Sequence, residues 1–286
     1  DNHVAAWKRV VDFVHDNSYS KIGMQISHAG RKASTRLQWD GGEQAPLSSG
    51  AWDIISASPI PYSASNPTPK EMNEADMEDV LNDFVMAAAR ADKAGFDMLE
   101  LHCAHGYLLN TFISPKTNIR SDDYGGSLEN RLRYPLKVFE TIREKWPEQK
   151  PISVRISATD WIEEGITPQD AVEIARAFKN IGCDILDVSS GQVVSEEKPE
   201  YGRLFQLPFS DRIRLEAEIP TMTVGNIQSY ADANSIIASG RGDICVIARM
   251  HLFDPYWTRH AANQLNYHLN MPNQYKSVQN YTPRWT

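Results

Sequence analysis

The chain has 286 residues, enough for one large domain or two ordinary ones. Acidic residues outnumber basic ones by 37 to 29, and the net charge of −8 argues against sequence-independent binding of nucleic acid, which needs a basic face. Apolar residues make up 41% of the chain, which supports a substantial core and excludes a disordered tail or a small disulfide-stapled scaffold.

The cysteines and the apolar runs indicate the compartment. Cys103, Cys183 and Cys245 stand far apart, which suits a reducing compartment and provides no C-x-x-C pair for zinc or an iron–sulfur cluster. No run approaches the ~18 apolar residues of a membrane span, and no signal peptide is visible. We therefore expect a cytoplasmic protein with no metal and no membrane partner.

The first predicted element is a helix, because Val4, Trp7, Val11 and Val14 recur at helical spacing. Six short β-rich runs then alternate with amphipathic helical stretches, and several runs are apolar at nearly every position, as strands covered on both faces are. The six predicted strands are Lys21–His28, Asp97–Cys103, Ile152–Ser157, Asp184–Ser190, Thr221–Gly225 and Ile244–Arg249.

Several helices between these strands carry start and stop signals. Asn73 is the predicted N-cap of a helix that ends at Gly95. Thr167 and Pro168 begin another helix, which ends at Gly182, and Asp254–Pro255 repeats this start signal near the end of the chain.

Alternating strands and helices favour either an open doubly wound sheet or a (β/α)₈ barrel. No G-x-G-x-x-G follows a strand, and every predicted strand ends in polar or small residues, as at the carboxyl-terminal face of a barrel. These residues are Gln25 and His28, His102 and His105, Arg155, Ser189 and Ser190, Gly225 and Asn226, and Arg249. We therefore predict an α/β fold, the TIM (β/α)₈ barrel.

The predicted strands number six, whereas this barrel needs eight. Because a helix precedes the first strand and no methionine starts the chain, we expect units three to eight here and the first two strands upstream. We predict the incomplete barrel over 1–265, with the Pro- and Gly-rich segment 41–70 as an excursion over its mouth and 266–286 as a C-terminal tail.

His102, His105 and Tyr107 lie together in LHCAHGYL, where the second predicted strand ends. A lone H-x-x-H lacks the third ligand that zinc sites use, so two N–H donors that hold a substrate carbonyl or anion are the favoured interpretation. Tyr107 can donate a proton at neutral pH. These three residues are the predicted catalytic set.

Arg155 is a charged residue within an apolar strand, and a buried guanidinium needs either a structural salt bridge or a bound anionic ring or phosphate. The loops after the last two strands of such barrels commonly bind phosphate through backbone N–H groups and nearby cations. The residues predicted for this end of the site are Ser190, Gly191, Gly225, Asn226, Ala248 and Arg249.

Three segments closely resemble the Old Yellow Enzyme family of FMN-dependent ene-reductases: Gln25–Ser34, His102–Arg131 and Val154–Ser157. The turns VGN (224–226) and IAR (247–249) also resemble this family, and the matching segments follow in the same order from about residue 1 to 265. A finer resemblance, carried by WKRVVDFVH, HCAHGYLLNTFISP and VSSGQVVSEEKPEYGR, is to the reductase half of flavoproteins acting on aromatic CoA thioesters, 2-aminobenzoyl-CoA (anthraniloyl-CoA) monooxygenase/reductase and the salicylyl-CoA 5-hydroxylase-like proteins.

The resemblance implies FMN across the barrel mouth, reduced by NADH or NADPH, and hydride transfer to an electron-poor C=C bond. It implies that Gln25 binds the flavin pyrimidine edge, that Arg155 lies near N1 and the C2 carbonyl, and that His102 and His105 hold the carbonyl of a small-molecule substrate. Tyr107 becomes the proton donor. The residues implied around the phosphate are Ser190, Gly191, Gly225, Asn226, Ala248 and Arg249.

The resemblance also bears on partners. A fused or associated FAD monooxygenase domain would account for the missing methionine and strands, and we expect a homo-oligomer. Some relatives insert an arginine from a neighbour's tail just after a Gln-Tyr pair, but here Lys276 follows Tyr275 and the nearest arginine is Arg284. No cysteine cluster follows the barrel, which disfavours the iron–sulfur branch of the family.

Two other functions remain open from the sequence. One is a phosphate-binding barrel without flavin, a lyase or isomerase that uses the two histidines as acid and base. This alternative gives Gln25 and Arg155 no role. The other is a degenerate barrel that serves as an interaction domain of a larger flavoprotein, which the missing strands favour and the intact His–His–Tyr set disfavours.

Overall fold

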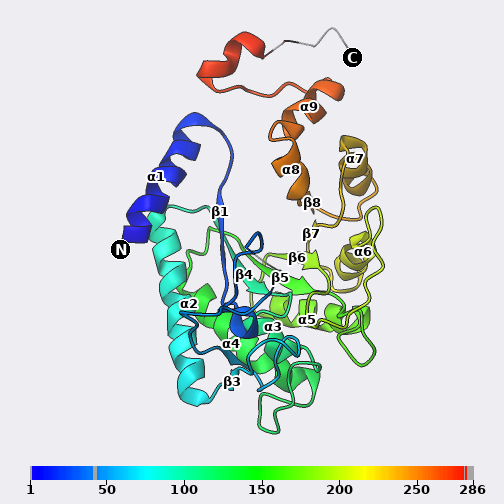
Figure 1. The fold of residues 1–286 in the computed structure, drawn as a ribbon. Coiled ribbons are helices and arrows are strands. Elements are labelled where there is room, and N and C mark those ends of the chain that lie inside the picture. Colours follow the sequence, from blue (N-terminus) through cyan, green and yellow to red (C-terminus); the bar gives the residue numbers. More distant parts are fainter. Residues whose placement is uncertain (1, 41–43, 280, 282–286) are drawn as a thin grey trace.

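A computed structural model describes residues 2–40, 44–279 and 281 (Figure 1). Six parallel strands form one sheet in the order β1-β4-β5-β6-β7-β8, so strands that follow one another in the alternation are neighbours. The strands are β1 (Gly23–Ile26), β4 (Met98–Cys103), β5 (Ile152–Ser157), β6 (Ile185–Ser189), β7 (Thr221–Thr223) and β8 (Ile244–Cys245). All six predicted strands are therefore present, although most are shorter than predicted.

Helices connect these strands and cover one face of the sheet (Figure 1). They are α2 (Glu74–Ala94), α3 (Leu108–Ile113), α4 (Leu128–Lys145), α5 (Pro168–Asn180), α6 (Leu207–Glu216) and α7 (Tyr230–Ala238). Helix α1 (Asn2–Asn17), which the apolar spacing predicts, precedes the sheet and packs on α2. After β8 come α8 (Arg249–Phe253), α9 (Trp257–Gln264) and the 3-10 helix η2 (Asn273–Val278), which extend away from the sheet (Figure 1).

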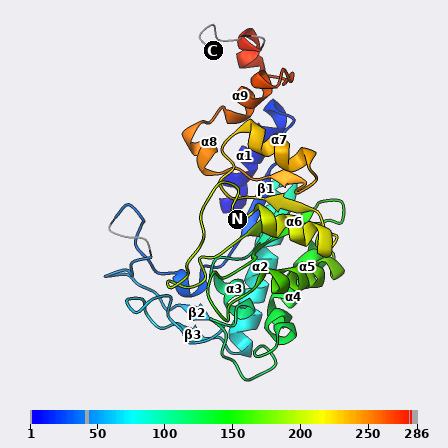
Figure 2. The same ribbon diagram turned by 90° about the vertical axis from the view of Figure 1, so that its right-hand side faces the viewer.

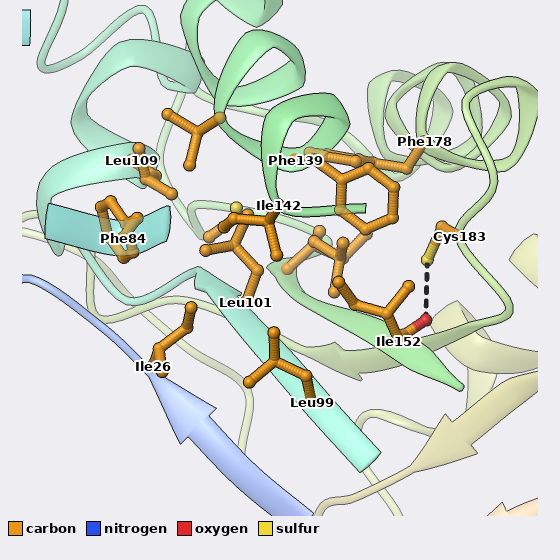
Figure 3. Packing of buried hydrophobic residues seen from close by; sticks show 14 of the residues in the cluster. Ile26, Phe84, Leu99, Leu101, Leu109, Phe139, Ile142, Ile152, Phe178 and Cys183 are labelled. Atoms are coloured by element: carbon orange, nitrogen blue, oxygen red, sulfur yellow. Dashed lines mark hydrogen bonds between the residues drawn. The ribbon is translucent and has the colours of Figure 1, made fainter. Parts of the chain in front are cut away.

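The core lies between the sheet and these helices. Side chains alternate along each strand, so Leu99 and Leu101 of β4 pack with Phe139 and Ile142 of α4 (Figure 3). Phe139 is fully buried, and truncating such a residue to Ala costs about 3–5 kcal/mol. The intervening residues, such as Glu100, face the opposite side of the sheet, which is the interior of the predicted barrel.

Two rows of interior residues follow from the register of the strands. In the upper row, Arg155 of β5 pairs with His102 of β4 on one side and with Asp187 of β6 on the other. In the row below, Glu100 of β4 lies between Gln25 and Ser153. The row nearer the carboxyl ends of the strands therefore contains two of the predicted site residues.

The sheet does not close within the described part of the chain, because β1 and β8 are each paired on one side only. The structure thus contains six consecutive β/α units of a (β/α)₈ barrel, and the interior is open between β1 and β8 (Figure 1).

Most predicted helix ends are correct. Asn73 and Thr167 both form capping boxes, and Gly95 ends α2 with a φ of +93°. The start predicted at Asp254–Pro255 is wrong: α9 begins at Trp257. The Asp254 carboxylate accepts from the Tyr256 N–H, and its backbone carbonyl accepts from the Trp257 N–H, so Asp254–Trp257 forms a turn ahead of the helix.

The segment after β1 leaves the sheet and returns at α2 (Figure 2). It begins with the short 3-10 helix η1 (Gly30–Lys32) and contains two short parallel strands that the sequence does not predict, β2 (Ile55–Ser56) and β3 (Lys70–Glu71). Residues 41–43 of the predicted excursion, and 280 and 282–286 of the predicted tail, lie outside the described residues.

Among the helices described, none has both the length and the apolar character needed to span a membrane.

Candidate active site

A cavity of about 910 Å³ opens at the carboxyl ends of the strands, where the polar strand endings predict a site. It collects one or two predicted residues from each of five successive strand ends. These residues are His105, Arg155, Ser189 and Ser190, Gly225 and Asn226, and Ala248 and Arg249. Residues up to 144 positions apart in the chain (105 to 249) thus share one cavity wall, because parallel strands bring their carboxyl ends to one edge.

Arg155 lies on this wall and forms an ion pair with Asp187. The Arg155 Nε lies 3.3 Å from Asp187 Oδ2, and the aspartate side chain is almost fully buried. Burial raises the pKa of Asp187 to about 7, although the nearby Arg155 charge works in the opposite direction. In the described part of the chain the terminal nitrogens of Arg155 make no hydrogen bond, so they remain available to a ligand.

His102, His105 and Tyr107 form one cluster, as predicted. The ring centroids of His102 and His105 are 5.2 Å apart, and those of His102 and Tyr107 are 5.0 Å apart, both in edge-to-face arrangements. The His102 Nδ1 accepts from the Ala104 backbone N–H, so its ring proton is on Nε2. His105 Nε2 lies 2.7 Å from Ser189 Oγ.

Both imidazoles are neutral at physiological pH. Burial lowers the pKa of His102 to about 3, and the charges of Arg155 and Lys32 add to this effect. Burial and the same two cations also hold the pKa of His105 well below its ordinary value. The pair can therefore act as neutral hydrogen-bond donors, but not as a pair of cations.

Two buried cations, which the residue patterns do not single out, fix the loops around this cluster. Arg31 is 1% exposed and donates to the carbonyl oxygens of Ile60, Pro61 and Val193. Lys32 donates to the carbonyl oxygen of His105. Both residues belong to the motif QISHAGRKAS, but nothing local in the sequence predicts that these charges would be buried.

The far end of the cavity suits a phosphate. Gly225 has a φ of +119°, and a Cβ there would lie 2.9 Å from the Cβ of Gln206, so only glycine fits without strain. The backbone N–H groups of Gly225 and Ala248 have no hydrogen-bond partner among the described residues. Arg249 is exposed, lines the same cavity, and forms no ion pair within that part of the chain.

Four predicted site residues do not line this cavity: Gln25, His102, Tyr107 and Gly191. Gln25 faces the open interior and binds Glu100, and the Gly191 N–H is paired with the Thr159 carbonyl oxygen. Conversely, the cavity wall includes residues that no sequence pattern indicates, among them Trp161, Glu197, Phe205 and Gln206. They lie on connections without periodicity, so only the fold places them there.

In the described ranges no cluster of His, Cys, Asp or Glu could hold a metal ion.

These donors fit FMN, the cofactor that the resemblance implies. Within the described residues, the unpartnered backbone amides of Gly225 and Ala248 and the Arg249 side chain match its phosphate. The terminal nitrogens of Arg155, which make no hydrogen bond there, match the carbonyl and ring nitrogen of its pyrimidine edge. The chemistry of the two ends of the cavity thus corresponds to the two polar ends of the cofactor.

Comparison with known proteins gives the same assignment. A sequence profile described as "NADH:flavin oxidoreductase / NADH oxidase family" matches residues 1–268. The chain is 42% identical over 276 residues to an NADPH dehydrogenase of Geobacillus sp. (strain WCH70), covering 96% of this chain and 76% of that protein. It is 36% identical to an NADPH dehydrogenase of Bacillus subtilis (strain 168), with the same coverage.

Solved structures agree in fold. A 2-naphthoyl-CoA reductase in complex with 2-naphthoyl-CoA superposes with a TM-score of 0.78 at 24% identity, covering 92% of this chain and 41% of that one. Histamine dehydrogenase from Rhizobium sp. 4-9 superposes with a TM-score of 0.74 at 26% identity, covering 91% of this chain and 37% of that one. Morphinone reductase superposes with a TM-score of 0.71 at 23% identity, covering 96% of this chain and 73% of that one.

The chain thus spans less than half of the first two of these structures. The likenesses confirm the predicted α/β barrel fold class. The profile match and the identity to the NADPH dehydrogenases confirm the resemblance to the Old Yellow Enzyme family, and the chain belongs to the NADH:flavin oxidoreductase / NADH oxidase family of FMN-dependent, NAD(P)H-dependent oxidoreductases.

Proposed function

We propose that this flavin oxidoreductase is an ene-reductase, which saturates a C=C bond conjugated to a carbonyl group. When bound, FMN would supply the redox chemistry, the transfer of hydride from NAD(P)H to the alkene. The observation that carries the proposal is the neutral His102–His105 pair, which joins Tyr107 beside the cavity that contains Arg155.

In this proposal the chain's own residues bind, orient and protonate. His102 and His105 donate N–H groups to the carbonyl oxygen of the substrate and stabilise the negative charge that develops there. Tyr107 gives its phenolic proton to the carbon next to that carbonyl. The cofactor is held by Gln25 and Arg155 at the pyrimidine edge and, around the phosphate, by Ser190, Gly191, Gly225, Asn226, Ala248 and Arg249.

We further propose that the excursion at 41–70 covers the mouth of the barrel. In its described part, Ile60 and Pro61 accept hydrogen bonds from Arg31, and the ring of Tyr62 lies 4.4 Å from Lys32 Nζ. The same Lys32 amine binds the carbonyl oxygen of His105. These contacts support a position for residues 60–62 next to the proposed substrate carbonyl.

The finer resemblance supports a proposal about the substrate, the CoA thioester of a dearomatised aromatic acid. A thioester provides the activating carbonyl that the histidine pair would hold. The test is competition: an aromatic acyl-CoA should inhibit reduction of 2-cyclohexenone at lower concentration than the free acid does. Equal inhibition by the acid would argue for an enone or enal substrate instead. A fused or associated FAD monooxygenase domain and a homo-oligomeric state also remain proposals.

The decisive experiment is an absorption spectrum of the purified chain, with the released cofactor identified by mass. The result that supports the ene-reductase is near-stoichiometric FMN whose absorbance is bleached by NADPH. In the absence of oxygen, 2-cyclohexenone should then restore that absorbance. A folded, colourless protein that also stays colourless when the chain is extended by additional upstream sequence supports the interaction-domain alternative. A colourless protein that binds sugar phosphates would favour the lyase or isomerase.

A further inference from the structure

We propose that Glu100 and Asp187 are positioning residues that orient Gln25 and Arg155 toward FMN. The inference rests on the proposed function, since it concerns the same site. Each acid faces the barrel interior and contacts a neighbouring strand's residue that is proposed to bind the flavin. Together they set which atoms of the two ligands point to the pyrimidine edge.

Glu100 determines the orientation of the Gln25 amide. Its Oε1 accepts from Gln25 Nε2 at 2.7 Å, and its Oε2 accepts from Ser153 Oγ at 2.8 Å. A carboxylate has only acceptor atoms, so Gln25 must turn its NH₂ group toward Glu100. The amide carbonyl oxygen of Gln25, which has no partner among the described residues, then remains as an acceptor for a ligand N–H.

Asp187 performs the corresponding function for Arg155. It forms an ion pair with the guanidinium, with 3.3 Å between Arg155 Nε and Asp187 Oδ2, and this contact is not a hydrogen bond. The two terminal nitrogens of Arg155 make no hydrogen bond among the described residues. Asp187 is 3% exposed, and its other oxygen, Oδ1, is buried without a hydrogen-bond partner in the described part of the chain. Burying a carboxyl group without hydrogen bonds is unfavourable, and the ion pair with Arg155 gives this burial a reason, since the carboxyl group holds the guanidinium in place.

The resulting pattern matches one edge of a flavin. The pyrimidine ring has one N–H donor, at N3, next to a carbonyl oxygen at C2 and an acceptor nitrogen at N1. Gln25 presents an acceptor and Arg155 presents donors. Loss of Glu100 lets the Gln25 amide turn, and loss of Asp187 releases the guanidinium, so either change weakens FMN binding without removing a ligand.

The first test needs no variant. Because the Gln25 oxygen accepts from the flavin N3–H, 3-methyl-FMN should bind the apoprotein at least tenfold more weakly than FMN, measured by quenching of flavin fluorescence. Equal affinity for the two flavins would overturn the role given to Glu100. If the unaltered protein binds no FMN, the proposed function and this inference fall together.

The second test is a pair of double-mutant cycles on FMN affinity. Glu100→Gln and Asp187→Asn should each weaken FMN binding about tenfold. In a protein that already carries Gln25→Ala, Glu100→Gln should weaken binding no further. In a protein that already carries Arg155→Met, Asp187→Asn should likewise weaken binding no further. Asp160→Asn, which alters a buried acid outside the cavity lining, is the matched control and should leave the affinity unchanged. Additive effects in FMN-binding protein would overturn this inference and leave the proposed function intact.

The flavin midpoint potential distinguishes positioning from a simple charge effect. At a pH well above 7, where Asp187 with its pKa of about 7 is ionised, removing its negative charge would by itself raise the potential. Releasing Arg155 from N1 would instead lower the potential, because a guanidinium there would stabilise the reduced, anionic flavin. We therefore expect Asp187→Asn to lower the potential. A rise would show that Asp187 acts only through its own charge and would overturn its positioning role.

Discussion

Lys32 donates a hydrogen bond from Nζ to the backbone carbonyl oxygen of His105, at 2.8 Å, across 73 residues of sequence. The same amine also donates to the carbonyl oxygen of Gln192. His105 has a φ of +60°, a conformation that costs a residue with a side chain about 1–2 kcal/mol, so the lysine helps to hold a strained backbone that places the imidazole.

Replacing Lys32 with Met should therefore loosen the histidine cluster. We expect affinity for p-hydroxybenzaldehyde, followed by its charge-transfer band with FMN, to fall about tenfold, the equivalent of ~1.4 kcal/mol. FMN affinity should change much less. Lys137→Met, which removes an exposed lysine that pairs with Glu78, is the control. An unchanged phenol affinity in Lys32→Met would remove the positioning role.

Replacing both His102 and His105 with Ala should abolish the phenol charge-transfer band while FMN stays bound. In the unaltered protein neither imidazole gains a proton near pH 6.5, because burial lowers both pKa values. Phenol affinity should therefore show no histidine transition between pH 6 and 8. A transition near pH 6.5 that disappears in the double variant would show that one of the two residues is protonated in that range.

Changing Tyr107 to Phe should affect only one half of the reaction. We expect reoxidation of the reduced enzyme by 2-cyclohexenone to slow by about 10²–10⁴-fold, the range for loss of a general acid. Reduction by NADPH should stay nearly unchanged, because no proton from Tyr107 is needed there. Stopped-flow absorbance resolves the two rates, and equal slowing of both would point to general damage.

Arg249 gives a test of the phosphate end. Arg249 is exposed and lines the same cavity as Gly225 and Ala248, whose amides have no hydrogen-bond partner among the described residues. Its guanidinium should therefore contribute to binding of FMN but not of riboflavin, which lacks the phosphate. We expect Arg249→Met to reduce the ratio of FMN to riboflavin affinity about tenfold. Arg241→Met, whose partner is Asp211, serves as the control. A constant ratio in Arg249→Met would place the phosphate elsewhere.

Asp160 predicts a pH dependence of stability. Burial raises its pKa to about 6 despite hydrogen bonds from the Ile166 N–H and Ser114; the charge of Arg131 lowers the pKa and that of Asp170 raises it. The folded state therefore holds this proton more tightly than the unfolded state. Its contribution to the free energy of unfolding is present below pH ~4 and is lost as the pH rises through 6, roughly 2–3 kcal/mol in all.

Asparagine at position 160 keeps an acceptor for both donors and carries no charge. Asp160→Asn should therefore match the unaltered protein at pH 4 and exceed it by about 2 kcal/mol at pH 8, measured by urea unfolding at both values. If the difference in unfolding free energy between Asp160→Asn and the unaltered protein were the same at pH 4 and pH 8, the raised pKa of Asp160 would be contradicted.

Much of the architecture follows from local signals in the sequence. The strands are apolar runs bounded by helices, and Asn73 and Thr167 cap those helices through contacts three residues away, which sequence spacing reveals. The position of the site also follows, because the carboxyl ends of parallel strands must meet at one edge. His105, Arg155 and Arg249 reach the same cavity for this reason.

The tertiary structure alone decided how these residues are held. The contacts of Gln25 with Glu100 and of Arg155 with Asp187 depend on strand register, and Lys32 reaches His105 only because two distant loops pack together. Neutral histidines and a high pKa for Asp160 follow from burial, which depends on every neighbour at once. Periodicity and caps are properties of short segments, whereas register, burial and long-range contacts belong to the whole fold.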